Sequence, residues 1–230
     1  MIKFGISARA VSNAIERRED AITQERAART AYDAACAAHG PRSRFAHACD
    51  DAELMTACDA WADAEVARSE ADAIAVAMQT ARRKQIENAI GRALYDHAAD
   101  LDGLPAHYKR THNRIRQIVG AALDVEPGEV NVYKTYSYSI KVACAGGTVE
   151  FYVGHEDIDA ESVRIWTRPK NGVDDLTPAK VRRLVAQRAR ALDTLREAAE
   201  AYQTTVRDTV RKFACIDDTD DLRKAAKVHI

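Results

Sequence analysis

The chain has 230 residues, 47% of them hydrophobic and 30% charged, and its 34 basic residues nearly balance its 35 acidic ones. This composition excludes a disordered chain, which combines low hydrophobicity with high net charge. The net charge of −1 also excludes a global attraction to nucleic acid or to an anionic membrane. Any basic surface must therefore be local.

Cysteine usage and hydropathy indicate the compartment. Five cysteines stand at irregular spacing, as is typical of free thiols in a reducing environment. The first residues form no apolar signal segment, and no stretch approaches the roughly 20 apolar residues of a membrane span. We expect a cytoplasmic protein without membrane contact.

Alanine recurs at helical spacing through the first hundred residues. Residues 7–39 carry alanine at every seventh position, and residues 43–101 continue a 3–4 alternation that ends in bulkier aliphatic side chains. Gly40 and Pro41 interrupt the pattern, and so short a break usually joins antiparallel neighbours. The sequence predicts an Ala-rich antiparallel helical hairpin, a coiled-coil-like arm over residues 1–101, with a possible kink at Gly91. The seam could also pair two copies, so a homodimer remains open. The alanines and larger residues of the predicted seam are Ala14, Ala21, Ala28, Ala35, Ala57, Ala60, Ala64, Ala67, Ala71, Ile74, Met78 and Ala81.

Residues 102–230 mix helical and strand patterns. Alternation with period two predicts one long strand over residues 130–144, in which Tyr136 and Tyr138 face the core. The remaining predicted elements are a helix at 106–123, strands at 148–153 and 163–167, a long helix at 177–213 capped by Thr177, and a short helix at 218–228. The predicted fold class is α+β, mostly α. It combines the hairpin with a three-stranded antiparallel sheet and a long C-terminal helix packed against the end of the arm.

A first candidate site lies at the tip of the hairpin. Two thiols and two imidazoles flank the Gly-Pro break, a ligand set that suits tetrahedral zinc. Their spacing matches no common zinc motif, so the alternative is a set of ordinary interface and solvated residues. We expect no cofactor. The four residues are Cys36, His39, His47 and Cys49.

A second candidate is the densest basic run in the chain, which could contact phosphates. Its alternatives are a solvated helix face, or neutralisation of the nearby Asp96, Asp100 and Asp102. The order helix, three strands, helix also occurs in double-stranded-RNA-binding domains, but the lysine-rich signature of that family is absent, so the order identifies no family. The basic residues considered are Lys109, Arg110, Arg114 and Arg116, together with Lys180, Arg182 and Arg183 at the start of the last helix.

Other motifs are weak. The acidic loop 155–161 could hold a hard cation, with a solvated loop as the alternative. The chain contains no phosphate-binding loop, dinucleotide fingerprint or activated nucleophile in a known context. We therefore expect a non-enzymatic protein–protein interaction protein: a scaffold, adaptor or inhibitor of a larger assembly, such as one carried by a phage. The alternative is a nucleic-acid-binding protein that uses the basic helix 107–116 and the sheet.

Overall fold

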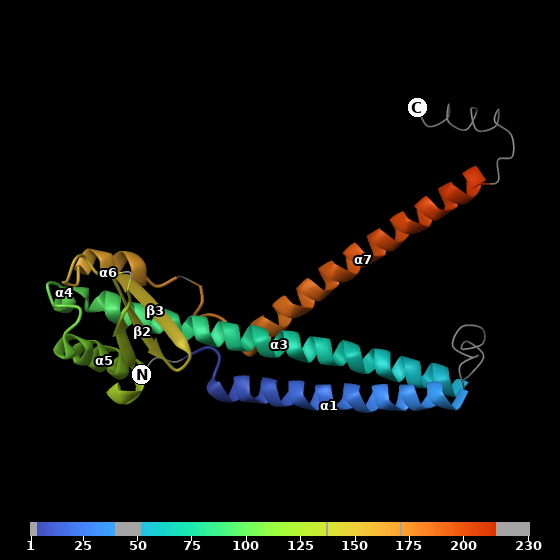
Figure 1. Ribbon diagram of the computed structural model, residues 1–230, viewed down its shortest axis with the longest axis horizontal. Helices are drawn as coiled ribbons and strands as arrows, with labels where there is room; N and C mark the ends of the chain where they lie inside the picture. Colours follow the sequence, from blue (N-terminus) through green and yellow to red (C-terminus); the bar gives the residue numbers. More distant parts are fainter. Residues whose placement is uncertain (1–3, 40–51, 137, 171, 215–230) are drawn as a thin grey trace. The chain divides into compact units, whose positions relative to one another are not determined.

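The computed structural model describes residues 4–39, 52–136, 138–170 and 172–214. The chain divides into two units, residues 1–182 and 183–230, and the fold is α+β and mostly α (Figure 1). Among the described helices, none combines the length and the apolarity that a bilayer crossing requires. The elements are α1 (Ala8–His39), α3 (Ala52–Asp96), α4 (Ala98–Leu101), α5 (Lys109–Leu123), η2 (Pro127–Glu129), β1 (Asn131–Lys134), β2 (Ser139–Cys144), β3 (Gly147–Tyr152), α6 (Ala160–Thr167) and α7 (Pro178–Ala214).

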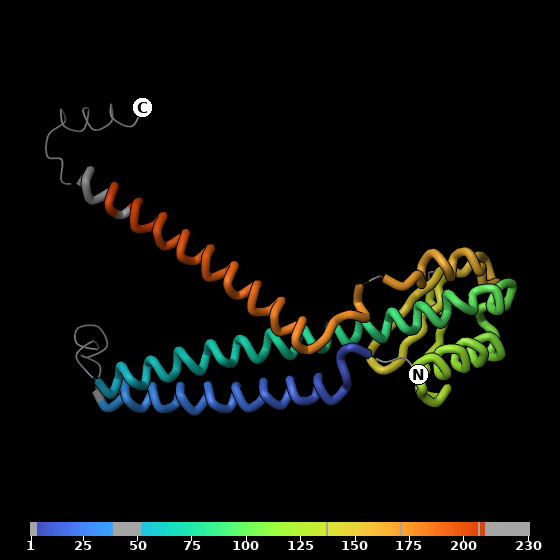
Figure 2. The backbone as a smooth tube through the Cα atoms, turned by 180° about the vertical axis from the view of Figure 1, so that it is seen from behind, coloured from blue at the N-terminus to red at the C-terminus, as the bar shows by residue number. Residues whose placement is uncertain are grey.

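The helices α1 and α3 lie side by side as an antiparallel hairpin (Figure 2). Late in α1, the ring of Tyr32 lies 5.1 Å from that of Trp61 early in α3. Trp61 also donates a hydrogen bond from Nε1 to the carboxylate of Glu25 at 3.2 Å. Towards the other end, Arg18 pairs with Asp72 at 2.7 Å. The predicted hairpin is confirmed, and its seam forms within one chain.

The exact seam differs from the predicted one. Ala60 and Ala67 are exposed, whereas Ala75, which the prediction omitted, is buried. Alanine occupies so many positions in this segment that several apolar stripes fit its spacing equally well. The larger side chains Trp61 and Met78 decide which stripe faces α1, because they gain most from burial.

The second half of α3 enters the main core of the protein. Its side chains pack with α5 and with the inner face of a sheet whose strand order is β1-β2-β3, antiparallel throughout. Val132 pairs with Val142, and Ile140 pairs with Phe151. The predicted three-stranded antiparallel sheet is thus confirmed. The residues of α3 in this core are Ile86, Ile90, Ala93 and Leu94.

The predicted strand 130–144 is wrong as a single element, because it is two strands joined by a turn. The amide of Thr135 donates to the carbonyl of Ser139 at 2.7 Å, and Tyr138 adopts a φ of 57°. Even-numbered residues of β1 pair with even-numbered residues of β2. The alternation of apolar and polar residues in the sequence therefore continues unchanged across the turn. A sequence pattern cannot separate this hairpin from one long strand. Tyr136 and Tyr138, predicted to face the core, are exposed.

The strand predicted at 163–167 is also wrong, since these residues belong to α6. The carboxylate of Asp159 accepts hydrogen bonds from the amide of Glu161 at 2.9 Å and the hydroxyl of Ser162 at 3.0 Å. These bonds lower the pKa of Asp159, and they satisfy donors at the start of the helix. Val163 and Thr167 are buried one helical turn apart. The cap at Asp159 and the burial of Val163 and Thr167, four residues apart, favour a helix. Together they outweigh the preference of β-branched residues for strands.

The long helix α7 begins as predicted. The hydroxyl of Thr177 accepts a hydrogen bond from the amide of Lys180 at 3.3 Å, which is the predicted N-cap. Val181, in the first turn, is buried with Ile6, Ala14 and Met78 in a second apolar cluster. The short helix predicted at 218–228 lies outside the described residues.

Gly91 marks a close packing contact in the middle of α3, which is assigned as one continuous helix from Ala52 to Asp96. A Cβ placed on Gly91 would lie 2.4 Å from the carbonyl oxygen of Thr167, at the end of α6. The glycine therefore lets α6 approach the backbone of α3.

We predict that Gly91→Ala lowers the free energy of unfolding by about 1–3 kcal/mol, because the methyl group must displace the α6 backbone. Alanine in a helix interior otherwise stabilises by about 1 kcal/mol relative to glycine, so the sign of the effect is diagnostic. Urea unfolding measures it. Gly128→Ala is the control, since a Cβ there meets nothing within 4 Å. A stabilising Gly91→Ala would contradict the close contact.

Candidate functional site

The predicted zinc site stays a prediction. Cys36 is half-buried in α1, but His47 and Cys49 lie outside the described residues, and so does the side chain of His39. Elsewhere in the described chain, no group of three or more histidine, cysteine or acidic side chains is arranged to hold a metal ion.

Part of the predicted basic site serves the fold. Arg114 pairs with Asp100 at 3.5 Å, as the neutralisation alternative expected. The pKa of Asp100 is lowered mainly by its hydrogen bond with His97, with a smaller contribution from Arg114. Arg116 donates from Nε to the carbonyl of Val130 at 3.1 Å, so it ties α5 to the approach to β1. Five residues of the predicted set have exposed side chains and form no ion pair among the described residues. They are Lys109, Arg110, Lys180, Arg182 and Arg183.

A groove that the sequence analysis did not predict runs between α3, β3 and the segment after α6. We call it the β3–α6 groove, and its volume is about 310 Å³. It is lined by Lys84, Glu87 and Asn88 of α3, by Thr148, Val149 and Glu150 of β3, and by Trp166, Thr167, Arg168, Pro169, Lys170 and Val173.

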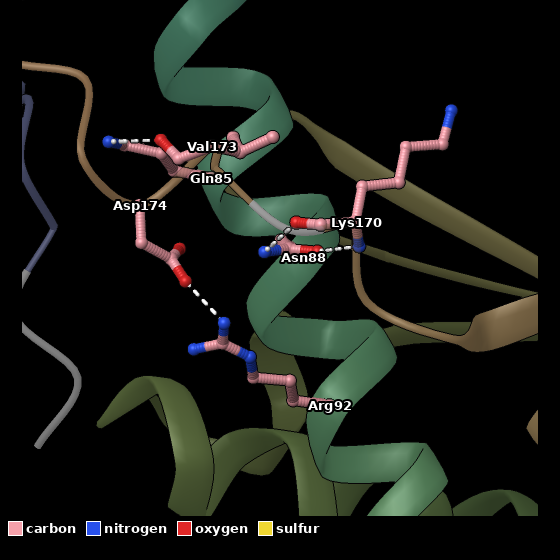
Figure 3. A network of polar contacts seen from close by, with 6 residues as sticks. All are labelled: Gln85, Asn88, Arg92, Lys170, Val173 and Asp174. Carbon is pink, nitrogen blue, oxygen red and sulfur yellow. Dashed lines mark hydrogen bonds and ion pairs between the residues drawn. The ribbon is translucent and has the colours of Figure 1, made fainter.

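Three polar side chains of α3 hold one wall of the groove in place (Figure 3). Asn88 donates to the carbonyl of Lys170 at 3.1 Å and accepts from its amide at 2.7 Å. One turn earlier, Gln85 donates to the carbonyls of Val173 and Leu176, each at 3.1 Å. One turn later, Arg92 pairs with the carboxylate of Asp174 at 2.5 Å. The segment after α6 is therefore positioned mainly through its backbone and through Asp174, and its outward side chains stay available.

Large apolar side chains are exposed beside this groove. Trp166 lines it and is 65% exposed, and its neighbour Ile165 is also 65% exposed. Neither belongs to the two buried clusters. Tryptophan is enriched at the centres of protein interfaces, where it contributes a large contact area.

The charges of the groove are unbalanced. Its two carboxylates have intramolecular partners, because Glu87 pairs with Arg83 at 2.8 Å and Glu150 pairs with Lys141 at 3.5 Å. The three cationic side chains of the lining have no ion pair among the described residues, and all are exposed. These are Lys84, Arg168 and Lys170. The groove thus presents uncompensated positive charge.

β3 is the last strand of the sheet in the described part of the chain, so every second residue of β3 turns its backbone groups away from β2. Cys144 and Gly147 pair across a two-residue turn, with φ values of 50° at Ala145 and 86° at Gly146. In a hairpin with a two-residue turn, the two residues on either side of the turn are hydrogen-bonded to each other through their backbones. Every second pair of residues after them is hydrogen-bonded between the strands in the same way. The backbone groups of Glu150 therefore point to the free edge.

The sequence analysis missed this groove because it placed Trp166 in a strand. A signal was present, since Asp159 followed by Glu161 and Ser162 is a good helix start. A helix from that point puts Ile165 on the face opposite Val163 and Trp166 at the edge of the buried face.

No family model, no curated protein and no solved structure matches this chain. The geometry of the chain itself is the basis for assigning a function.

We predict that Asn88→Ala lowers the free energy of unfolding by about 1–3 kcal/mol, because it leaves the backbone of Lys170 without its partners. Asn88 is buried, at 6% exposure. Amide exchange at Lys170, measured by NMR, should accelerate.

The control is Arg92→Ala, which removes a partly exposed ion pair and should cost at most about 1 kcal/mol. An equal or larger loss in Arg92→Ala would show that the amide contacts are not the main support of the groove wall.

Proposed function

We propose that the protein is a non-enzymatic protein–protein interaction protein, and that the β3–α6 groove binds an acidic, extended segment of a partner protein. The observation that carries the proposal is Trp166, exposed beside a groove lined by uncompensated cations and by the free edge of β3. This is the interaction expected of an adaptor or of an inhibitor of a larger assembly.

Each feature of the groove contributes one part of the recognition. An extended segment can pair its main chain with the edge strand at Glu150, which supplies affinity without sequence selection. Trp166 supplies an apolar anchor, and Lys84 and Lys170 favour carboxylates. Long-range attraction between opposite charges mainly raises the rate of association and the specificity.

The pKa shifts of Asp159, Asp100 and Cys144 give no support to a catalytic role. Those of Asp159 and Asp100 follow from a helix cap and from contacts with His97 and Arg114. The pKa of Cys144 is raised by burial in the core. These shifts have structural causes, and none of the three residues lines the β3–α6 groove.

Photo-crosslinking tests the proposal. A benzophenone side chain replaces Ile165, which flanks the groove but does not line it, so Trp166 stays intact. In cells that produce the protein, we expect one discrete protein adduct, with the crosslink mapped by mass spectrometry to an acid-rich segment. Charge reversal by Lys84→Glu with Lys170→Glu should weaken this adduct at least about tenfold.

The matched control places the same group at Tyr108, an exposed aromatic residue that precedes α5. Equal adducts at both positions, or an adduct at position 165 that survives charge reversal, would contradict the proposal. Circular dichroism checks that the charge-reversed protein keeps its helices.

A second candidate function is nucleic-acid binding through the start of α5. It is favoured by Lys109 and Arg110, which are exposed next to the exposed Tyr108. It predicts salt-sensitive binding to RNA or DNA, with Lys109→Ala and Arg110→Ala together reducing affinity. An electrophoretic mobility shift at low salt measures it. Equal binding by this variant and the unchanged protein, or no binding at low salt, eliminates this candidate.

A further inference from the structure

The strand β3 directs its side chains alternately to the two faces of the sheet. Phe151 is fully buried and Val149 packs against the main core, so both lie on the inner face. Glu150 stands between them in the strand and is exposed. Its neighbour in β2 is Lys141, whose neighbour in β1 is the exposed Tyr133. At the free edge of β3, the outer face therefore carries the carboxylate of Glu150.

The walls of the β3–α6 groove lie on the inner side of the sheet. α3 and α6 both contribute side chains to the core that the inner face of the sheet closes, among them Ile90 and Val163. From these elements and the segment after α6, the groove is lined by Lys84, Trp166 and Lys170. A side chain that points inward from a segment bound at the edge of β3 therefore faces two lysines and a tryptophan.

The part of the β3 edge that can pair with a bound segment is short. The carboxylate of Glu87 accepts a hydrogen bond from the amide of Thr148 at 3.4 Å, so this donor is already occupied. Just beyond the end of β3, Val153 forms a bridge with Ile158. The backbone groups of Glu150 lie between these two points. A bound segment therefore pairs through one residue opposite Glu150 and through the immediate neighbours of that residue.

A segment paired in this way continues the pleat of the sheet. The residue opposite Glu150 points its side chain to the outer face, beside the carboxylate, and the residues before and after it point inward. Like charges directly opposite each other destabilise a strand pair, whereas opposite charges stabilise it. An acidic residue is therefore favoured at the two inward positions and disfavoured between them.

The charge of Glu150 is only partly compensated. Its carboxylate pairs with Lys141 at 3.5 Å, and the two side chains remain 42% and 36% exposed. It also accepts a hydrogen bond from the hydroxyl of Ser139. Both partners belong to β2, on the side away from the free edge. A carboxylate that arrives at the edge therefore meets Glu150 before it meets Lys141.

We infer that the segment bound by the β3–α6 groove carries its acidic and apolar anchor residues at alternate positions, with a neutral or basic residue opposite Glu150. This selection, which rests on the proposed function, makes Glu150 a specificity-determining residue. Lys84 and Lys170 attract acidic segments in general, and Glu150 rejects those in which the acidic residues are consecutive. Specificity commonly combines such an attractive and a repulsive element.

Two synthetic peptides of identical composition test the selection. The alternating peptide, Thr-Asp-Thr-Asp-Thr-Leu, can turn an aspartate and the leucine inward with threonine opposite Glu150. In the block peptide, Thr-Thr-Thr-Asp-Asp-Leu, the same inward placement sets an aspartate opposite Glu150. The full isotope-labelled chain is titrated at low salt, and the amide resonance of Glu150 is followed by NMR. We expect the alternating peptide to bind at least about threefold more tightly.

The variant Glu150→Gln should raise the affinity for the block peptide and bring the ratio of the two affinities to about one or below. Glutamine carries no charge but still accepts the hydrogen bond of Ser139. The matched control is Glu65→Gln, which removes an exposed carboxylate of α3 that does not line the groove, and it should keep the preference. Equal affinities in the unchanged protein, or a preference that survives Glu150→Gln, overturn the inference.

The same titrations separate this inference from the proposed function. If both peptides bind equally and Lys84→Glu with Lys170→Glu weakens both, the groove binds acidic segments without the selection, and only the role of Glu150 is overturned. If neither peptide binds, the groove proposal fails and the selection fails with it.

Discussion

The buried side chain of Gln85 connects three parts of the chain that are distant in sequence. It is 1% exposed, and its oxygen accepts a hydrogen bond from the amide of Ile6 at 3.1 Å. Its nitrogen donates to the carbonyls of Val173 and Leu176. The side-chain oxygen and both N–H groups of Gln85 thus have hydrogen-bond partners, which offsets the cost of burying this polar group. The entry to α1 and the approach to α7 are both fixed on one turn of α3.

This turn separates two kinds of packing along α3. Before it, α3 packs against α1 in a two-helix seam, which Val181 of α7 joins only beside Ala75 and Met78. After it, Ile90 and Leu94 enter a core closed by α5 and the sheet. A two-helix seam encloses little volume, so the hairpin has mostly surface to offer. The β3–α6 groove forms on the thicker side, where strand, helix and loop meet.

Sequence reasoning succeeded where one face of an element is buried over many turns. The hairpin and the cap of α7 at Thr177 follow from spacing and local hydrogen bonding. It failed where local pattern and tertiary packing disagree. The alternation of 130–144 is the same for one strand and for a hairpin, and the β-branched run 163–167 is helical because Val163 and Thr167 face the core. The start of α6 at Asp159 could have been predicted, but the groove could not, since it also depends on a long-range contact between Asn88 and Lys170.

The size of the β3–α6 groove limits how tightly it can bind a partner. A groove of about 310 Å³ holds a few side chains, and a short acidic segment loses conformational entropy when it binds, so a single groove is expected to bind weakly. Trp166 and the edge of β3 therefore have to supply most of the affinity, whereas Lys84 and Lys170 mainly raise the rate of association and the specificity.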